Sequence, residues 1–341
     1  MTLSTMPHQY IDRNSLQVIT EKPIADRSIQ FLYTTLRENA PAMFRALTSG
    51  RMSSLLGYFH YDMPGKNRNC GKDLFNRFGA DWQECINPVG FYDSHRKFFE
   101  RQIRYWETRP MNRKQTTIVS PADSRLLIGS FTETSTLFIK DKFFDLAELL
   151  GPDTSWHRRF LGGDFAVFRL TPDKYHYNHV PVDGRVVAIY NVDGRYHSCN
   201  PSALITTASL YSKNRRVVTI IDTDVPGGTA IGLVAMVEIV ALMIGDIVQA
   251  YSEERYDHPQ DIRPGQMVKR GCPKSLFRPG SSTDVVIFEP GRIAFAEDLV
   301  NNSQRRDVQS RFTSGYNRPL VETDVAARSS IAEPLRQTQQ F

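Results

Sequence analysis

The chain has 341 residues, 40 % apolar and 23 % charged, so we expect a folded protein with a substantial core and not a disordered one. Its net charge of +5 favours an anionic partner, but no basic run interleaved with aromatic residues indicates nucleic acid. Four scattered cysteines without a Cys-x-x-Cys pair argue against a zinc site or a disulfide framework and favour a cytoplasmic, reducing compartment.

The first third of the chain is expected to be helical. Residues 1–27 are polar and contain proline, so we expect an irregular segment there. Residues 28–61 carry apolar side chains at helical spacing, with Pro41 as a break, and residues 91–106 predict another helix rich in aromatic and basic residues. These helices suit either packing on the domain itself or peripheral contact with a membrane surface, and both interpretations stay open.

The remainder of the chain has the texture of a β-rich body. Short runs of Val, Ile, Leu and Thr alternate with turn residues over 111–328, and residues 329–341 are expected to be a flexible tail. The apolar stretch 229–248 contains Glu238 and Asp246, whose charges disfavour a membrane span, so we expect buried strand and turn.

The expected fold class is therefore α+β, with a helical region over residues 28–110 joined to the β-rich body. No long Gly/Ser linker separates the two parts, which favours one integrated unit.

A serine-rich turn precedes a short apolar run near the C-terminus. Its residues, in order, are Pro279, Gly280, Ser281, Ser282, Thr283 and Asp284, followed by Val285, Val286, Ile287 and Phe288. The pattern predicts a tight turn that leads into a buried strand. The hydroxyls either bond their own backbone or include a serine that attacks the neighbouring carbonyl.

Two further stretches carry candidate acid–base groups. Asp123 lies in a turn between two apolar runs, where it either bonds its own backbone or acts in chemistry. His176 and His179 lie in a segment bracketed by Pro172 and Pro181, which argues against a helix presenting both to a metal, so we expect no metal. Structural and acid–base roles stay open for both histidines.

These parts are those of an Asp–His–Ser triad, although such parts occur by chance in most chains of this length. Their order and surroundings resemble the phosphatidylserine decarboxylase family. The serine turn, the apolar strand and the Pro-Gly that closes it are similar to the family's Gly-Ser-Thr and Phe-x-Pro-Gly motifs. Three other stretches resemble family motifs: Pro121 to Ser124, Lys174 to Pro181, and Phe98-Phe99-Glu100-Arg101 with Arg109-Pro110. The chain departs from the family at three positions. Ser124 stands where glycine is usual, Lys174 where aspartate is usual, and Ser281 where many members have glycine.

The resemblance implies that the chain cuts itself. His179, oriented by Asp123, would take the proton of Ser282 Oγ, which attacks the carbonyl of Ser281. Cleavage between Ser281 and Ser282, or alternatively between Gly280 and Ser281, would give a large β chain and a small α chain. Ser282 would become the cofactor, a covalently bound pyruvate (pyruvoyl) group.

The resemblance further implies a zymogen that, once cut, converts phosphatidylserine to phosphatidylethanolamine as a dimer of αβ units. His176 is implied as the proton donor to the carbon that loses CO2. The missing membrane anchor and the altered serine site keep open a soluble decarboxylase of a free amino acid, as in related fungal tryptophan decarboxylases. Ser124 and Lys174 suggest a third hypothesis, an unprocessed lipid-binding relative.

Overall fold

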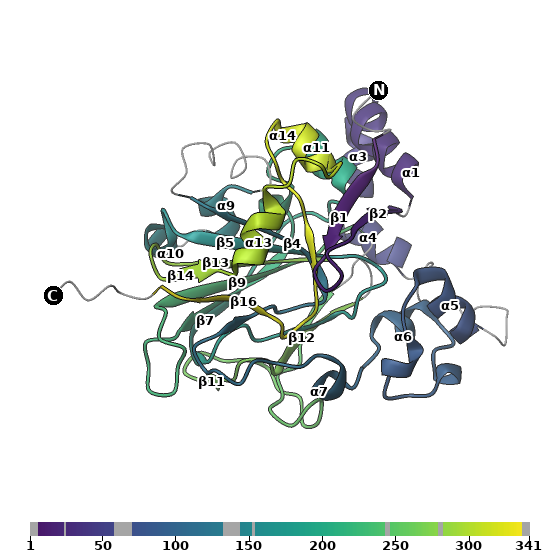
Figure 1. The fold of residues 1–341 in the computed structure, drawn as a ribbon. Coiled ribbons are helices and arrows are strands. Elements are labelled where there is room, and N and C mark those ends of the chain that lie inside the picture. Colours follow the sequence, from purple (N-terminus) through teal and green to yellow (C-terminus); the bar gives the residue numbers. More distant parts are fainter. Residues whose placement is uncertain are drawn as a thin grey trace.

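A ten-stranded sheet runs through the part of the chain that the structure describes (Figure 1). This computed structural model describes residues 6–23, 25–57, 70–131, 144–151, 154–242, 246–278 and 282–335. Its strand order is β11 (Met267–Val268), β7 (Gly184–Val192), β8 (Arg216–Asp222), β9 (Leu233–Ile239), β13 (Ser282–Phe288), β5 (Asp164–Leu170), β4 (Ser124–Ser130), β15 (Thr323–Val325), β1 (His8–Asp12) and β2 (Val18–Glu21). Neighbouring strands are antiparallel except β1 and β15, which are parallel.

Strand β13 lies in the middle of this sheet and is buried at every residue. It pairs with β5 over its whole length and with β9 from Thr283 onward. Side chains alternate across a strand, so Val285 and Ile287 enter one apolar cluster while Val286 and Phe288 enter the other. The same alternation places Ser282 on the face of Val286 and Phe288.

Two three-stranded sheets complete the β structure of the described residues. One has the order β10 (Asp246–Gln249), β12 (Pro273–Arg278) and β6 (Tyr177–His179); the other has β14 (Ile293–Phe295), β16 (Ser330–Pro334) and β3 (Ile118–Val119). Strand β12 ends four residues before β13 begins. The first small sheet therefore brings β6, with His179 at its end, beside the chain that leads to Ser282.

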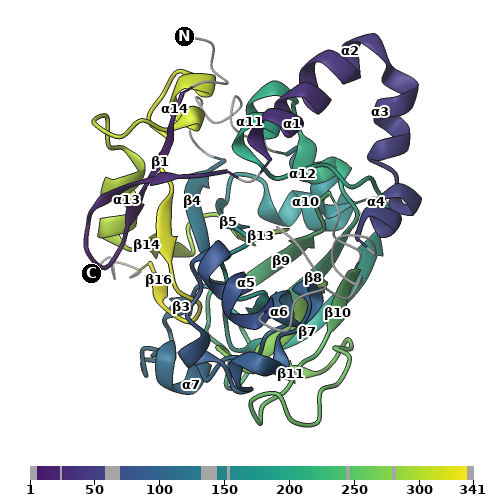
Figure 2. The ribbon, with the colours of Figure 1, turned by 90° about the vertical axis from the view of Figure 1, so that its right-hand side faces the viewer.

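The helices form separate groups around the sheets. In Figures 1 and 2 the first group, α1 to α4, lies apart from α5, α6 and α7. The helical bounds are α1 (Asp26–Phe31), η2 (Leu32–Leu36), α2 (Arg37–Asn39), α3 (Pro41–Leu47), α4 (Gly50–Gly57), α5 (Cys70–Phe78), η4 (Trp82–Glu84), η5 (Val89–Phe91), α6 (His95–Phe99), α7 (Tyr105–Thr108), α9 (Leu146–Leu150), α10 (Thr154–Phe160), α11 (Pro201–Thr206), α12 (Leu210–Lys213), α13 (Glu297–Ser303) and α14 (Arg311–Tyr316). Among the described residues, no helix has the length and apolar character that crossing a membrane requires.

The N-terminal hairpin β1–β2 is held by one buried arginine of β5. Arg169 Nη2 lies 2.6 Å from Glu322 Oε2 and 2.6 Å from Glu21 Oε2, and His8 Nε2 lies 2.8 Å from the same Glu322 oxygen. His8, Glu21 and Glu322 are close enough together to suggest a metal site, but the Arg169 guanidinium occupies their midst and neutralises them.

The structure confirms the α+β fold class and corrects several local expectations. The segment 1–27 was expected to be irregular, yet it contains β1 and β2, because β1 finds a partner in β15 at the other end of the chain. The expected helix over 91–106 is broken between α6 and α7. Part of the expected flexible tail is β16, which pairs with β3 and β14.

Other expectations are confirmed. Within the described part of the expected segment 28–61, the chain is helical from α1 to α4, with the break at Pro41, where α3 begins, and residues 58–61 lie outside the described part. The apolar stretch 229–248 forms β9 and most of β10, with residues 243–245 outside the described part. Glu238 is buried in β9, where a cation neutralises it.

Candidate active site

Asp123 is held as an ionised carboxylate in the turn between β3 and β4. Arg109 Nε donates to Asp123 Oδ1 at 2.8 Å and Nη2 donates to Oδ2 at 2.7 Å, while the backbone N–H of Ala327 donates to Oδ1 at 2.7 Å. The same guanidinium donates to both carboxylate oxygens of Glu84 at 2.8 Å. Burial by itself raises the pKa of Asp123, but the charge and hydrogen bonds of Arg109, the charge of Lys174 and the N–H of Ala327 together outweigh burial and lower the pKa to about 2.

His179 is a buried, neutral imidazole. Its Nδ1 lies 2.9 Å from the carbonyl oxygen of Gly271, which can only accept, so Nδ1 carries the ring proton. Its Nε2 lies 3.1 Å from the hydroxyl oxygen of Tyr175, and the ring of Tyr105 packs against it edge to face. Burial lowers the pKa of His179 to about 4, so at neutral pH Nε2 offers a lone pair.

Asp123 and His179 are neighbours without a direct hydrogen bond in this structure. The backbone N–H of His179 donates to the carbonyl of Pro121 at 2.7 Å, which places β6 beside the turn that carries Asp123. The imidazole bonds Gly271 and Tyr175, and the carboxylate bonds Arg109 and Ala327. Here Asp123 acts on His179 through its charge, which raises the pKa of the imidazole against the larger effect of burial. That Asp123 orients His179 stays a prediction.

Ser282 and His176 are both completely buried. Ser282 is the first residue of β13, opposite Leu170 of β5, and its Oγ has no hydrogen-bond partner among the described residues. The His176 ring packs edge to face on Phe99, with 5.3 Å between centroids. Residues 280 and 281, which precede the two alternative cuts, lie outside the described part.

A small buried apolar cluster joins the stretches that carry the four candidate residues. Its members are Ala122, Leu170 and Phe277. Ala122 precedes Asp123, Leu170 lies opposite Ser282, and the backbone N–H of Phe277 donates to the carbonyl of His176 at 3.1 Å. The structure therefore brings together the segments that carry the four candidates, which are up to 159 positions apart in the sequence (123 to 282).

Two of the departures from the family pattern have clear local environments. Ser124 is buried and its Oγ donates to the carbonyl of Ala122 at 3.4 Å. Lys174 points toward β15, where its Nζ donates to Asp324 Oδ1 at 2.7 Å and Oδ2 at 3.0 Å. Neither side chain forms a hydrogen bond or ion pair with His179 or Ser282 among the described residues.

Sequence reasoning missed a buried polar cluster next to Ser282. Asp284 lies two residues further along β13 on the same face, directly opposite Glu238 of β9. Lys274 Nζ donates to Glu238 Oε2 at 2.6 Å and Ser275 Oγ donates to the other oxygen, whereas neither oxygen of Asp284 has a partner among the described residues. Burial, together with the negative charge of Glu238, raises the pKa of Asp284 well above its usual range, which favours its protonated form.

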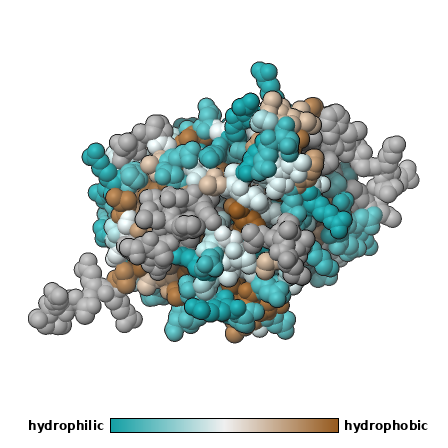
Figure 3. Space-filling model, turned by 90° about the horizontal axis from the view of Figure 1, so that it is seen from above, coloured by the Kyte–Doolittle hydropathy of each residue, from teal (hydrophilic) through white to brown (hydrophobic). Residues whose placement is uncertain are grey.

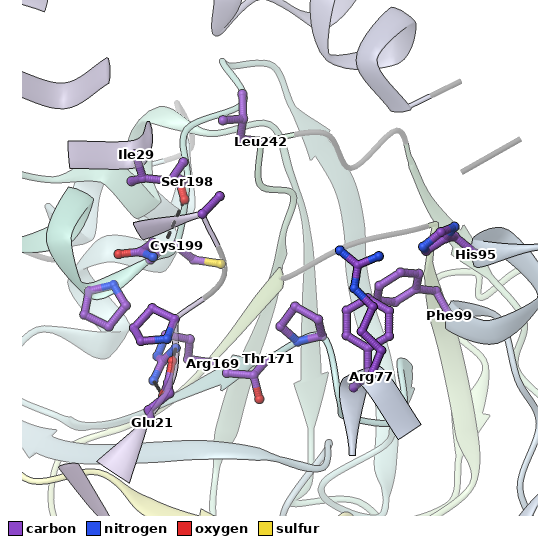
Figure 4. A pocket seen from close by; sticks show the side chains of 16 residues that line it. Glu21, Ile29, Arg77, His95, Phe99, Arg169, Thr171, Ser198, Cys199 and Leu242 are labelled. Atoms are coloured by element: carbon purple, nitrogen blue, oxygen red, sulfur yellow. Dashed lines mark hydrogen bonds and ion pairs between the residues drawn. The ribbon is translucent and has the colours of Figure 1, made fainter. Parts of the chain in front are cut away.

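A pocket of about 350 Å³ adjoins the site. Figure 4 shows Arg77, His95 and Phe99 on one side of it and Glu21, Arg169 and Cys199 on the other. Phe99 contacts His176, and Thr171, which also lines the pocket, follows the residue opposite Ser282. The pocket therefore reaches the edge of the buried site, and its size is in the range of small-molecule sites.

Comparison with known proteins agrees with this arrangement. A family model described as "Phosphatidylserine decarboxylase" matches residues 95–313. The chain is 31 % identical over 319 residues to the phosphatidylserine decarboxylase proenzyme of Chlamydia caviae, covering 91 % of this chain and 96 % of that protein. It is 28 % identical over 314 residues to the proenzyme of Fusobacterium nucleatum, covering 90 % and 95 %. Phosphatidylserine decarboxylase proenzyme 3 of Schizosaccharomyces pombe is 30 % identical over 281 residues, covering 82 % of this chain and 27 % of that protein.

These matches identify an enzyme of the carboxy-lyase class. More particularly, the chain belongs to the phosphatidylserine decarboxylase family, as its motifs indicated.

The first prediction concerns the protonation of Asp284. The pKa of Asp284 in the folded chain lies above the ordinary 3.8. The contribution of this side chain to the free energy of unfolding is therefore intact below pH 3.8 and is lost as the pH rises toward the folded pKa. Asp284→Asn needs no proton, so the free energy of unfolding of the variant relative to the parent should increase with pH, by at most about 1.4 kcal/mol per pH unit.

Urea unfolding at pH 5 and pH 7 measures this difference, in a Ser282→Ala background so that chemistry at the serine does not interfere. The exposed Asp257→Asn serves as control and should show no such increase. A difference for Asp284→Asn that is the same at both pH values would contradict the prediction.

Proposed function

We propose that the chain is a pyruvoyl-dependent decarboxylase that cuts itself between Ser281 and Ser282 and then converts phosphatidylserine to phosphatidylethanolamine and CO2. The observation that carries the proposal is Ser282 itself. It is buried at the first position of a central strand, its Oγ has no partner among the described residues, and it lies in the family's serine motif. A buried hydroxyl left without a partner costs about 1–3 kcal/mol, which a role in chemistry would explain.

The proposed self-cleavage uses only groups of this chain and one water. His179 takes the proton of Ser282 Oγ, and Oγ bonds to the carbonyl carbon of Ser281 as the C–N bond between the two residues breaks, leaving an ester and a free amine. Loss of the Cα proton of residue 282 then breaks its Cβ–O bond and releases the N-terminal piece as a carboxylate. Water replaces the nitrogen of the remaining dehydroalanine, ammonia leaves, and a pyruvoyl group results.

The surroundings of Ser282 fit such a group. Residue 282 would carry it inside a completely buried strand end, beside the apolar cluster of Ala122, Leu170 and Phe277, where bulk water is excluded. A pyruvoyl group supplies a ketone that takes up the electron pair released when CO2 leaves a bound amine. His176, buried against Phe99, would hold the proton that the resulting carbanion needs.

The pocket supports a phosphate-bearing substrate. Arg77 of α5 lines it and has no ion-pair partner within the described part of the chain. A phosphodiester that enters beside Phe99 and Thr171 would find this cation on the same wall, because Arg77, His95 and Phe99 lie together there (Figure 4). The carboxylate and amine of a serine headgroup would then point toward the edge of the site next to residue 282.

The first helices support peripheral contact with a membrane. Phe31 of α1, Met43 of α3 and Leu55 of α4 are each about half exposed, at 56 %, 56 % and 48 %. Ile29 of α1 lines the pocket, so the first of these helices borders it. Seen from above, the coloured residues are mostly hydrophilic, with hydrophobic ones in separate spots (Figure 3), as suits shallow contact more than insertion. A dimer of αβ units remains a prediction from family resemblance.

The second prediction tests the attacking hydroxyl. Ser282→Ala should leave the chain in one piece, because the oxygen that forms the ester is gone, and Ser281→Ala should still cut, because it keeps the carbonyl that is attacked. Denaturing gels and intact mass after long incubation measure both, and the small piece of the parent should carry a carbonyl that hydrazine or borohydride traps. If Ser281→Ala stays uncut while Ser282→Ala is cut, the alternative bond, Gly280–Ser281, is the one that breaks. An uncut parent chain would favour the unprocessed lipid-binding relative.

The third prediction separates the two histidines. His176→Ala should still cut, since His179 remains, but should release CO2 at least about 100-fold more slowly, because a positioned general acid contributes roughly that much. Intact mass and CO2 release from phosphatidylserine liposomes measure the two steps. A variant that fails to cut at all would show that the two histidine roles are exchanged.

The fourth prediction concerns the substrate. Arg77→Ala should raise KM for dispersed phosphatidylserine by about 10-fold or more with a smaller effect on kcat, because a hydrogen bond to a charged group is worth about 1.5–3 kcal/mol. Arg113→Ala, at an exposed position outside the pocket, is the matched control. CO2 release from free tryptophan, tyrosine or serine but not from the lipid would overturn the lipid assignment in favour of a free amino acid.

A further inference from the structure

A chain of hydroxyl groups leads from the buried His179 through the buried Tyr175 to the partly buried Tyr256. His179 Nε2 lies 3.1 Å from Tyr175 Oη, and Tyr175 Oη lies 2.7 Å from Tyr256 Oη. Tyr256 Oη lies 2.9 Å from the carbonyl oxygen of Ile103 and 3.2 Å from its amide nitrogen. His179 lies in β6 and Tyr175 in the turn before it. Tyr256 lies in the segment after β10, and Ile103 lies between α6 and α7.

With His179 neutral, the protons in this chain have one consistent arrangement. Gly271 fixes the ring proton on Nδ1, so Nε2 can only accept, and Tyr175 must donate to it. The oxygen of Tyr175 then accepts from Tyr256, whose own oxygen accepts from the Ile103 amide. In this state Tyr256 does not donate to the carbonyl of Ile103. That carbonyl still accepts from the backbone N–H of Tyr105 at 2.8 Å.

When His179 holds a second proton, the same chain reverses. Nε2–H donates to Tyr175, Tyr175 donates to Tyr256, and Tyr256 donates to the carbonyl of Ile103 at 2.9 Å. Each tyrosine keeps one proton throughout, and only the direction of the hydrogen bonds changes. Every donor and acceptor is satisfied in both states, because the last carbonyl tolerates either one donor or two.

We propose that Tyr175 and Tyr256 are positioning residues that let His179 pass between imidazole and imidazolium inside a dry site. This rests on the proposed function, in which the Tyr175 O–H turns away from the lone pair of Nε2 and that lone pair takes the proton of Ser282 Oγ. Burial alone strongly opposes the imidazolium, since its second N–H would lose its hydration. Because the two hydroxyls can reverse, Tyr175 accepts from that N–H in the imidazolium state and donates to Nε2 in the neutral state. A group that could only accept would leave neutral Nε2 unsatisfied.

The charged groups around His179 act on its imidazolium form in opposite directions. Arg328, which follows β15, and Arg109, which follows α7, disfavour the imidazolium, and Asp123 favours it. The remaining neighbours, Tyr105 of α7 and Tyr175, are neutral, because burial holds the pKa of each tyrosine above its usual range. Asp123 is largely neutralised by Arg109, so an acceptor that responds to the proton is needed in addition.

The fifth prediction, and the test, is Tyr256→Phe. Neutral His179 keeps its bond from Tyr175, but in the imidazolium state the Tyr175 hydroxyl has no acceptor. Self-cleavage should therefore slow about 10- to 100-fold at pH 7, as expected for a buried donor left without a partner. The acid limb of the rate profile should move to lower pH, because the pKa of His179 falls. Tyr177→Phe is the matched control. The ring of Tyr177 packs on both Tyr175 and Tyr256, but its hydroxyl bonds Gln102, which is not part of the hydrogen-bond chain from His179.

A second measurement does not depend on cleavage. In an uncut Ser282→Ala chain with labelled histidine, nitrogen NMR should show His179 protonated at Nδ1, and Tyr256→Phe should leave that tautomer unchanged, although the loss of the acceptor for the Ile103 N–H should lower the thermal unfolding temperature. Cleavage by Tyr256→Phe within about twofold of the parent, an equal loss in Tyr177→Phe, or a proton on Nε2 in neutral His179 would each overturn the proposal. If the parent chain does not cut, the proposed function fails, while the tautomer still tests the hydrogen-bond chain by itself.

Discussion

The central position of β13 is the constraint on which the rest of the site depends. The strand pairs with β5 from Ser282 onward and with β9 from Thr283 onward, and it is buried at every residue, so its backbone has little room to shift and relieve an unfavourable group at its first position. Ser282 is such a group, since its buried hydroxyl has no partner in the described residues. A rigid strand that presents an unsatisfied nucleophile is what an intramolecular attack requires, because the serine loses little further freedom on reaching the transition state.

Two ionisable groups lie beside this strand, and their environments drive their pKa values apart. Asp123 is buried with a cation, so it stays charged, whereas His179 is buried with neutral partners, so it stays uncharged. Because Arg109 takes up both oxygens of Asp123, the carboxylate has little capacity left to hold the imidazole directly. The geometry is thus that of a base which acts as a neutral imidazole and is supported by hydroxyls, with the carboxylate acting at a distance.

The sequence predicted the parts of the molecule that local patterns determine. The run of β-branched residues from Val285 to Phe288 predicted β13, and Pro41 predicted the start of α3, because each signal acts within a few residues. The N-terminal hairpin escaped prediction because its stability comes from β15, more than 300 positions away, where Ile11 faces Thr323. Long-range pairing leaves no local trace in a single sequence.

The same distinction applies to the site. The motif pattern singled out Asp123, His176, His179 and Ser282 as one group, and the fold brings segments next to them into one apolar cluster. Tyr256, by contrast, lies 81 residues from Tyr175 in an irregular segment without a motif, and only the fold reveals their contact. No motif distinguishes Asp284 in the sequence. Its burial opposite Glu238, which favours the protonated form, follows from the register of β13 and β9.

The altered residues also show how the site tolerates change. At position 174 the family resemblance leads one to expect an aspartate, and a lysine there reverses a charge close to Asp123. The lysine is neutralised by Asp324 of β15, which Arg125 of β4 also contacts at 2.5 Å. Because this ion-pair network lies beside the carboxylate and not in its hydrogen-bond shell, its effect on Asp123 is to lower the pKa of a group that Arg109 already keeps ionised. A charge reversal here therefore leaves the protonation state of the site unchanged, which is why Lys174 does not by itself argue against a working enzyme.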